Sequence, residues 1–188
     1  LVSVVASGAM DLSQPDEQRY VVFFERPKVT RLSEVLANTR GRIPSTVIVE
    51  KIIQPLTQAI LALQEAGVTH GSIRLDNIFF DGQAILGPCV IEPCGYSQPY
   101  YYELLERMQA HPAGKGEFHP GADFYAMAVL VMEILFGSNH FARFNPELLA
   151  RLILRQGNFN ALTAGREPPE EFHDFLWGML GTGTNQRW

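Results

Sequence analysis

Cysteine is scarce in this sequence of 188 residues, which contains only Cys89 and Cys94. Two cysteines are too few for the disulfide framework of a small secreted domain, and two ligands alone do not make a closed zinc site. We therefore expect buried or loop thiols in a reducing compartment, a cytoplasmic location and no metal site.

Long hydrophobic runs and basic runs are also missing. The most apolar stretch, residues 124–136, is interrupted by Glu133 and is too short to cross a bilayer, so no membrane-spanning segment is expected. The 20 Asp and Glu residues outnumber the 15 Lys and Arg residues, which gives a formal net charge of −5. Neither nucleic acid nor an anionic membrane is therefore expected as the main partner.

The composition that is present, with 46% hydrophobic and 19% charged residues, is that of an ordinary folded protein. A chain of this length can bury a core and fits one domain. The sequence begins at Leu1 within a strand-like run and stops at Trp188 after a turn, so we expect both ends to continue into further elements.

Hydrophobic periodicity predicts an α+β protein whose last two thirds is mostly helical. A polar segment between the first two strands predicts a hairpin with a long connection. Asp81 and Gly82 predict a two-residue turn between the last two strands. The predicted strands cover residues 1–6, 19–24, 78–80 and 84–86.

A long helix is predicted to end near Ala66, with Gly67 just beyond it and Ser45 or Thr46 as its N-cap. Pro55 lies inside this helix and lacks an N–H group, so we expect a kink or a restart there. The other predicted helices cover residues 31–38, 122–136, 146–155 and 169–180.

The most informative stretch runs from Val68 to Phe80 and reads Val-Thr-His-Gly-Ser-Ile-Arg-Leu-Asp-Asn-Ile-Phe-Phe. Its frame is that of a protein-kinase catalytic loop, His-Arg-Asp-Leu-x-x-x-Asn followed by an apolar strand. A helix that ends with Gly precedes it, as in the family. Residues 123–137 open with Asp and close with Glu-x-x-x-Gly, like the central helix of a kinase. Residues 175–188 resemble the helix and turn that carry a structural arginine.

With these pieces in this order, the chain resembles the C-terminal lobe of a eukaryotic-type protein kinase. The resemblance implies a protein kinase-like fold of class α+β, with a mainly helical C-lobe that contains a small β-hairpin. Residues 1–25 would be two strands at the end of the N-lobe, residues 26–30 the hinge, and residues 31–188 a C-lobe truncated at its end. The Gly-rich loop, the strand lysine and the helix glutamate of a kinase would all precede Leu1.

The resemblance also indicates that two catalytic carboxylates are missing. Ser72 stands where a kinase has the aspartate that accepts or orients the proton of the substrate hydroxyl. Gly87 falls at the position of the aspartate that binds Mg²⁺. Glu92 lies past the second strand of the hairpin and is not expected to replace it.

Other positions in the loop differ from the family pattern or keep it. Arg74 replaces a lysine that contacts the transferred phosphate, and a salt bridge with Asp76 is the simpler expectation. Asn77 is retained at the place of a second metal ligand, where it would brace the loop by hydrogen bonds. Gly71 replaces an arginine that pairs with a phosphorylated activation segment, so regulation by that route is not expected.

The resemblance assigns structural roles to four residues. His70 should pack under the loop, and Asp123 should accept backbone N–H groups from it. Glu103 and Arg187 match a buried ion pair between the activation segment and the helical lobe. The tyrosines just before Glu103 are expected to be buried against the central helix instead of phosphorylated.

We expect no cofactor, with ATP bound without Mg²⁺ as the alternative; Asn77, Phe79 and Arg26 would then contact it. The sequence thus predicts a pseudokinase, a catalytically inactive module for protein binding, scaffolding or allosteric regulation. Its partner would be another protein or another domain of the same polypeptide. The alternative is an atypical nucleotide-dependent transferase that uses Arg74, Asp76, Asn77 and Asp81. Residues 111–121 and the helix at 146–155 are candidate docking surfaces.

Overall fold

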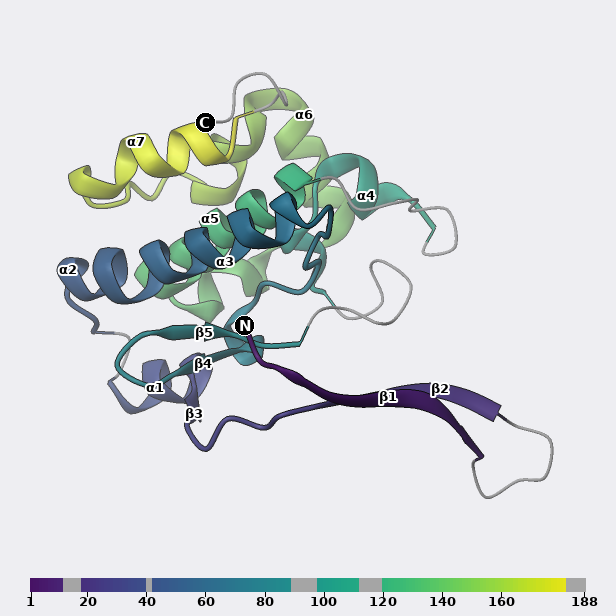
Figure 1. Cartoon of the computed structure of the whole chain (residues 1–188). Coiled ribbons are helices and arrows are strands. Elements are labelled where there is room, and N and C mark those ends of the chain that lie inside the picture. The colour runs from purple at the N-terminus through teal and green to yellow at the C-terminus, as the bar shows by residue number, and fades with distance from the viewer. Residues whose placement is uncertain (12–17, 40–41, 89–97, 112–119, 182–188) are drawn as a thin grey trace.

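The computed structural model describes residues 1–11, 18–39, 42–88, 98–111 and 120–181. A mostly helical body carries a small sheet on one side, and a two-stranded ribbon projects from it (Figure 1). The body is built mainly from four helices: α3 (Gln54–Glu65), α5 (Pro120–Phe136), α6 (Pro146–Thr163) and α7 (Glu170–Met179). The predicted α+β class is therefore confirmed.

The projecting ribbon consists of β1 (Val4–Asp11) and β2 (Gln18–Phe24), paired antiparallel. The predicted hairpin is confirmed, but its first strand extends five residues further than expected. Within the described residues no third strand joins this sheet. Large apolar side chains on the ribbon are therefore exposed, with Val5 68% and Tyr20 72% accessible to solvent.

A second, three-stranded sheet has the order β3 (Thr30–Arg31), β4 (Ile78–Phe80) and β5 (Ala84–Leu86), all antiparallel. The predicted strands β4 and β5 are confirmed, and β3 is too short to give a sequence signal. The predicted two-residue turn is wrong, because the pairing of Phe80 with Ala84 leaves a loop of three residues. The N–H of Asp81 donates to the carbonyl of Gln83 within that loop.

The long helix before the loop is built in three parts. A short α2 (Ser45–Val47) leads into a π-helical stretch, Ile48–Ile53, and then into α3. The wider π turns accommodate Pro55 at the start of α3, so the expected restart is confirmed. The predicted N-cap is wrong, because Pro44 holds that position and the hydroxyl of Ser45 instead donates to Glu171 on α7 at 2.6 Å.

The core is centred on α5, in which every residue from Tyr125 to Met132 is buried. The helix α3 packs on it through Ile52, Leu56 and Ile60, none of which is exposed. By length and composition, Ser45–Glu65 is the only described helix that could span a membrane. Its most apolar face lies in this core.

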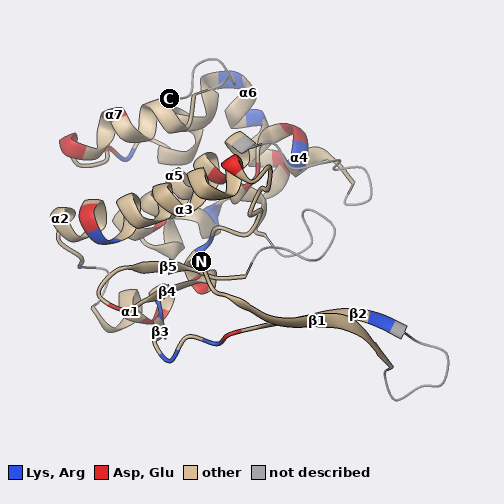
Figure 2. Cartoon of the chain, in the orientation of Figure 1, with Lys and Arg blue, Asp and Glu red and all other residues tan. Residues whose placement is uncertain are grey.

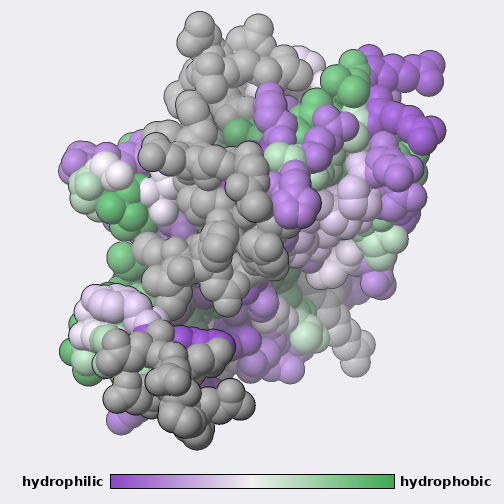
Figure 3. All heavy atoms as spheres, turned by 90° about the vertical axis from the view of Figure 1, so that its right-hand side faces the viewer, coloured by the Kyte–Doolittle hydropathy of each residue, from purple (hydrophilic) through white to green (hydrophobic). Residues whose placement is uncertain are grey.

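The helix α6 and several shorter elements complete the body. The helix α6 was predicted to end at residue 155. Its first segment is broken at Gly157, which has φ 79°, and a second helical segment then continues to Thr163. On the face seen in Figure 3, hydrophobic side chains of the described residues occur in small groups among hydrophilic ones. The remaining helical elements are α1 (Leu32–Asn38), α4 (Leu105–Gln109) and 3₁₀ turns at Leu75–Asn77, Tyr100–Tyr102 and Ser138–Arg143.

Candidate functional site

The loop between α3 and β4 is fixed from below by Asp123, near the start of α5. The carboxylate accepts the backbone N–H of His70 at 2.7 Å and that of Gly71 at 2.9 Å. Asp123 is buried, and this burial raises the pKa of its carboxyl group while the two N–H donors lower it. Charge-assisted bonds of this kind are stronger than those between neutral groups, so they fix the backbone path at the start of the loop.

His70 lies beneath the loop and is fully buried. Its Nδ1 accepts the N–H of Ser72 at 3.2 Å, and its Nε2 lies 3.0 Å from the carbonyl of Gly87. An acceptor at Nδ1 and a donor at Nε2 define the neutral imidazole. Burial lowers the pKa of His70 to about 4. The hydrogen bond to the Gly87 carbonyl raises the pKa, but by less than burial lowers it. The ring is therefore an uncharged brace between the loop and the end of β5.

Ser72, which the sequence resemblance places at the position of the catalytic aspartate, is also buried. Its hydroxyl oxygen accepts a hydrogen bond from Arg74 Nη1 at 2.6 Å. Arg74 Nε in turn lies 2.6 Å from Asp76 Oδ1, so the guanidinium group links both side chains. These three polar side chains satisfy one another within the loop.

Asn77 closes the loop against the end of β5. Its side-chain amide donates to the carbonyl of Ser72 at 2.9 Å and to that of Pro88 at 3.0 Å. Both N–H groups of the amide are therefore used. The backbone carbonyl of Asn77 accepts the N–H of Gly87 at 2.9 Å.

Gly87 approaches Asn77 so closely that no side chain fits there. A Cβ atom at this position would lie 2.3 Å from Asn77 Oδ1 and 2.4 Å from the Asn77 carbonyl oxygen. Neither Gly87 nor the next residue, Pro88, carries a carboxylate. Among the described residues, no group of three His, Cys, Asp or Glu side chains is arranged to hold a metal ion.

Arg26 and Phe79 come together at a second place, a pocket of about 300 Å³ beneath the segment that joins β2 to β3. Figure 2 shows that Lys and Arg lie close together along this segment. Asn77 is not among the residues that line this pocket, and its amide instead binds the carbonyls of Ser72 and Pro88. We call this hollow the hinge pocket; its other lining residues are Pro27, Lys28, Val29, Thr30, Arg31 and Glu34.

Comparison with known proteins agrees with this geometry, although no family model matches the chain. Over 165 residues the chain is 26% identical to the mouse (Mus musculus) myotonin-protein kinase. The matched region covers 79% of this chain and 26% of the mouse protein. The crystal structure of Rad53 residues 1–466 in complex with AMP-PNP superposes with a TM-score of 0.66 at 19% identity. That match covers all of this chain and 47% of the Rad53 chain.

The chain has a protein kinase-like fold. It spans about a quarter of the mouse kinase and about half of the Rad53 structure. The described part of this kinase-like fold contains a helical lobe, the loop and the strands that lead into it, as the sequence resemblance implied.

Three consecutive tyrosines in the kinase-like fold precede Glu103, which is buried. Tyr102 is buried and its hydroxyl is hydrogen-bonded to Glu133 of α5; burial raises the pKa of this phenol well above its usual value. The hydroxyl of Tyr100 donates to the carbonyl of Phe144 at 2.6 Å. The expected burial against the central helix is therefore confirmed for Tyr102. Arg187, the expected partner of Glu103, lies outside the described residues.

Glu133 was missed as a site residue, although the sequence carried a signal for it, since it is the only charge in an otherwise apolar run. With Ser33, Leu75 and Ser138 it lines two adjoining cavities of about 350 and 330 Å³. Together they form a groove between α1, the loop and the 3₁₀ turn after α5. We call it the loop groove; Arg74, Asp76, Pro99, Tyr101 and Tyr102 line its one end.

Proposed function

We propose that this chain is a pseudokinase, a kinase-like domain that does not transfer phosphoryl groups and acts as a protein-binding, scaffold or allosteric module. The contact between Gly87 and Asn77 is the observation that supports this most directly. A carboxylate at Gly87 would need a Cβ atom in space that Asn77 already fills. The principal Mg²⁺ ligand of a kinase therefore has no room at this position.

The environment of Ser72 supports the same proposal. A serine hydroxyl does not act as a base near neutral pH, and general-base catalysis contributes roughly 10²–10⁴-fold to enzymatic rates. The bond from Arg74 gives this hydroxyl oxygen a positively charged donor, which disfavours its taking a further proton. Ser72 thus serves the shape of the loop in this proposal.

The alternative of an atypical transferase would need free polar groups around the loop. Arg74 and Asp76 bind each other, and the amide of Asn77 is fully used by two carbonyls. These bonds favour a structural role over chemistry for the three residues. Asp81, the fourth residue of that alternative, is exposed in the turn after β4.

Nucleotide binding without catalysis remains compatible with the proposal. The matched Rad53 structure contains AMP-PNP, and the hinge pocket carries Arg26, Lys28 and Arg31, whose charges suit phosphate groups. We propose that any nucleotide binds here without Mg²⁺. Thermal-shift titration with ATP tests this: a rise in melting temperature that is equal with Mg²⁺ and with EDTA is expected, whereas a rise only with Mg²⁺ would contradict it.

The decisive experiment measures transfer of ³²P from ATP with Mg²⁺ or Mn²⁺, using the full-length protein, to itself and to generic protein substrates. We expect no more incorporation than in the matched Asn77→Ala variant. Transfer by the natural protein that disappears in the Asn77→Ala variant would overturn the proposal. We further propose that the ligand is a cytoplasmic protein or another domain of the same polypeptide.

A further inference from the structure

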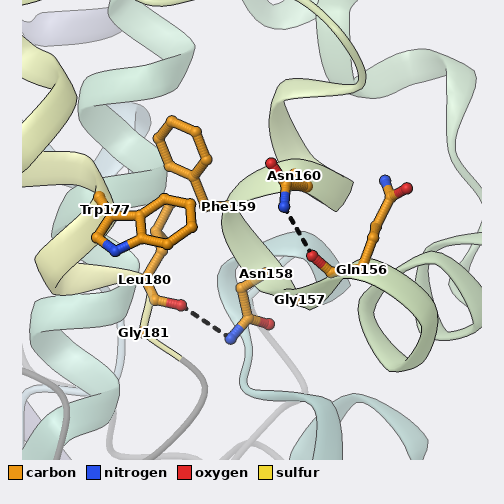
Figure 4. Close-up of a pocket in the computed structure, with 8 residues that line it drawn as sticks. All are labelled: Gln156, Gly157, Asn158, Phe159, Asn160, Trp177, Leu180 and Gly181. Carbon is orange, nitrogen blue, oxygen red and sulfur yellow. Dashed lines mark hydrogen bonds between the residues drawn. The ribbon is translucent and has the colours of Figure 1, made fainter.

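A pocket of about 620 Å³ opens in the helical body away from the loop, between the break in α6 and the end of α7. Figure 4 shows Trp177 and Phe159 on one side of it, and Gln156 and Asn160 on the other. Asn158 lies between the two sides. The volume falls within the range of about 300–1,000 Å³ that is usual for ligand sites.

The break in α6 creates this pocket. Gly157 has φ 79° and ψ 165°, a conformation that side chains disfavour, and it turns the second helical segment away from the first. The break places Gln156 on one side of the hollow and Asn158 between its two sides. The carbonyl of Gln156, freed from the helix, accepts the side-chain amide of Asn160 at 2.9 Å.

No charged side chain is found among the described residues that line the pocket. Three carboxamides, two aromatic rings, a leucine and two glycines form it: Gln156, Asn158, Asn160, Phe159, Trp177, Leu180, Gly157 and Gly181. Burying an ion here would carry a desolvation cost that no opposite charge offsets. The pocket therefore selects an uncharged ligand.

The polar groups of the pocket suit peptide bonds. Asn158 is 6% exposed, and its amide nitrogen donates to the carbonyl of Leu180 at 3.0 Å. Its Oδ1 atom is buried without a hydrogen-bond partner among the described residues, and buried polar atoms of this kind are rarely left unpaired. Pairing Oδ1 requires an N–H or O–H donor from outside the described residues. Gln156 and Asn160 offer further donors and acceptors at its exposed rim.

The aromatic side of the pocket suits a flat apolar group. Trp177 packs edge-on against Phe159 at 5.1 Å and stacks with His173 at 6.2 Å, yet 54% of it is exposed. A rigid indole with an open face next to carboxamides is the combination that binds proline-rich segments in aromatic grooves.

We propose that this pocket binds an uncharged, proline-containing peptide segment of a partner protein. The prolines pack against Trp177, and backbone groups of the peptide pair with the carboxamides. This proposal rests on the protein-binding role proposed above and names one surface for it. It adds a site at the far end of α6 to the docking surface expected at residues 146–155.

The test is an NMR titration of the ¹⁵N-labelled chain with a synthetic peptide of alternating proline, alanine and glutamine. We expect shifts of the Trp177 indole N–H and of the carboxamide signals of Gln156, Asn158 and Asn160. The Trp177→Ala variant should bind about tenfold more weakly or worse, as expected for an aromatic anchor. Leu154→Ala is the matched control, since Leu154 is 71% exposed on α6 and does not line the pocket.

A second variant, Gln156→Glu, changes an exposed rim residue and adds one charge, so it should weaken binding without affecting the fold. The proposal fails if the neutral peptide causes no shifts, or if peptides with Glu or Lys in place of Gln bind better. It also fails if Trp177→Ala binds as well as the natural chain, or if dilution alone moves the Trp177 signal, which would make a second copy the occupant. Absence of phosphoryl transfer is measured separately, so failure here and failure of the inactive-kinase proposal are distinguishable.

Discussion

The two sides of the loop differ in what their polar groups do. On the buried side, Asp123 and His70 bind backbone groups and connect the loop to α5 and β5. On the open side, the side chains of Ser72, Arg74 and Asp76 form hydrogen bonds with one another in the described part of the chain. The buried side therefore connects the loop to the core, whereas the side chains of the open side, where a kinase would perform its chemistry, connect parts of the loop to one another.

The largest expected effect comes from Asp123, because Asp123→Ala leaves the buried N–H groups of His70 and Gly71 without an acceptor. Two charge-assisted bonds at about 1.5–3 kcal/mol each predict a loss of about 3–6 kcal/mol in the free energy of unfolding, measured by urea denaturation. Asp123→Asn keeps one acceptor oxygen and should lose less. A loss below about 1 kcal/mol in Asp123→Ala would show that the buried side does not hold the loop.

His70 makes the stability that the buried side of the loop contributes sensitive to pH. Its pKa falls from 6.5 in the unfolded chain to about 4 in the folded one, so the unfolded state binds more protons between these values. Stability should therefore be full above pH 6.5 and decline by about 3 kcal/mol as the pH falls towards 4. Asp123, whose pKa is raised, acts in the opposite direction near the acid end, and His140, whose pKa is lowered, acts in the same direction as His70.

Denaturation curves between pH 4 and 7 measure this effect, with His70→Gln as the comparison. The variant should be less stable at pH 7 and should show a smaller slope, with His140 still contributing. An identical slope in the two proteins would mean that His70 is not the titrating group.

An intermediate effect is expected at the contact between Gly87 and Asn77. Gly87→Ala forces a Cβ atom into occupied space, and overpacking of this kind typically costs about 1–3 kcal/mol. Gly8→Ala is a matched control, since a Cβ at Gly8 meets nothing within 4 Å. Equal melting temperatures of the two variants would contradict the close contact.

The smallest effect is expected on the open side. Asp76→Ala removes an ion pair whose carboxylate is 53% exposed, so the loss should lie within about 0–1 kcal/mol. Thermal unfolding at low and high salt measures it, because screening should remove most of the difference. A loss as large as that of Asp123→Ala would erase the distinction between the two sides.

Much of the helical lobe was predictable, because α5 is a nearly continuous apolar run that ends at Gly137, and the helix before the loop shows apolar periodicity and ends at Gly67. The break at Gly157 was not predicted, since a single glycine in a helical pattern does not reveal its φ angle. The turn after β4 was assigned one residue too short, because register depends on pairing across the sheet. The strand β3 has only two residues and exists through its partner β4.

Within the site, motif spacing predicted that Asn77 braces the loop by hydrogen bonds, and its bonds to the carbonyls of Ser72 and Pro88 confirm this. It did not predict the close contact between Gly87 and Asn77 or the bond from Arg74 to Ser72. Spacing along a loop says which residue types are present, whereas the bond from Arg74 to Ser72 depends on how the loop folds back. The pocket beside Trp177 was not predicted, because its lining comes from two helices, α6 and α7, whose packing the sequence pattern does not reveal.

The missing space at Gly87 also bears on how this chain could change during evolution. A single substitution that brings back a carboxylate at Gly87 would first collide with Asn77, so the protein would lose stability before it gained a metal ligand. A return to metal-dependent chemistry would require coordinated changes at both positions. Under the inactive function proposed above, packing at this one contact makes the loss of that chemistry difficult to reverse.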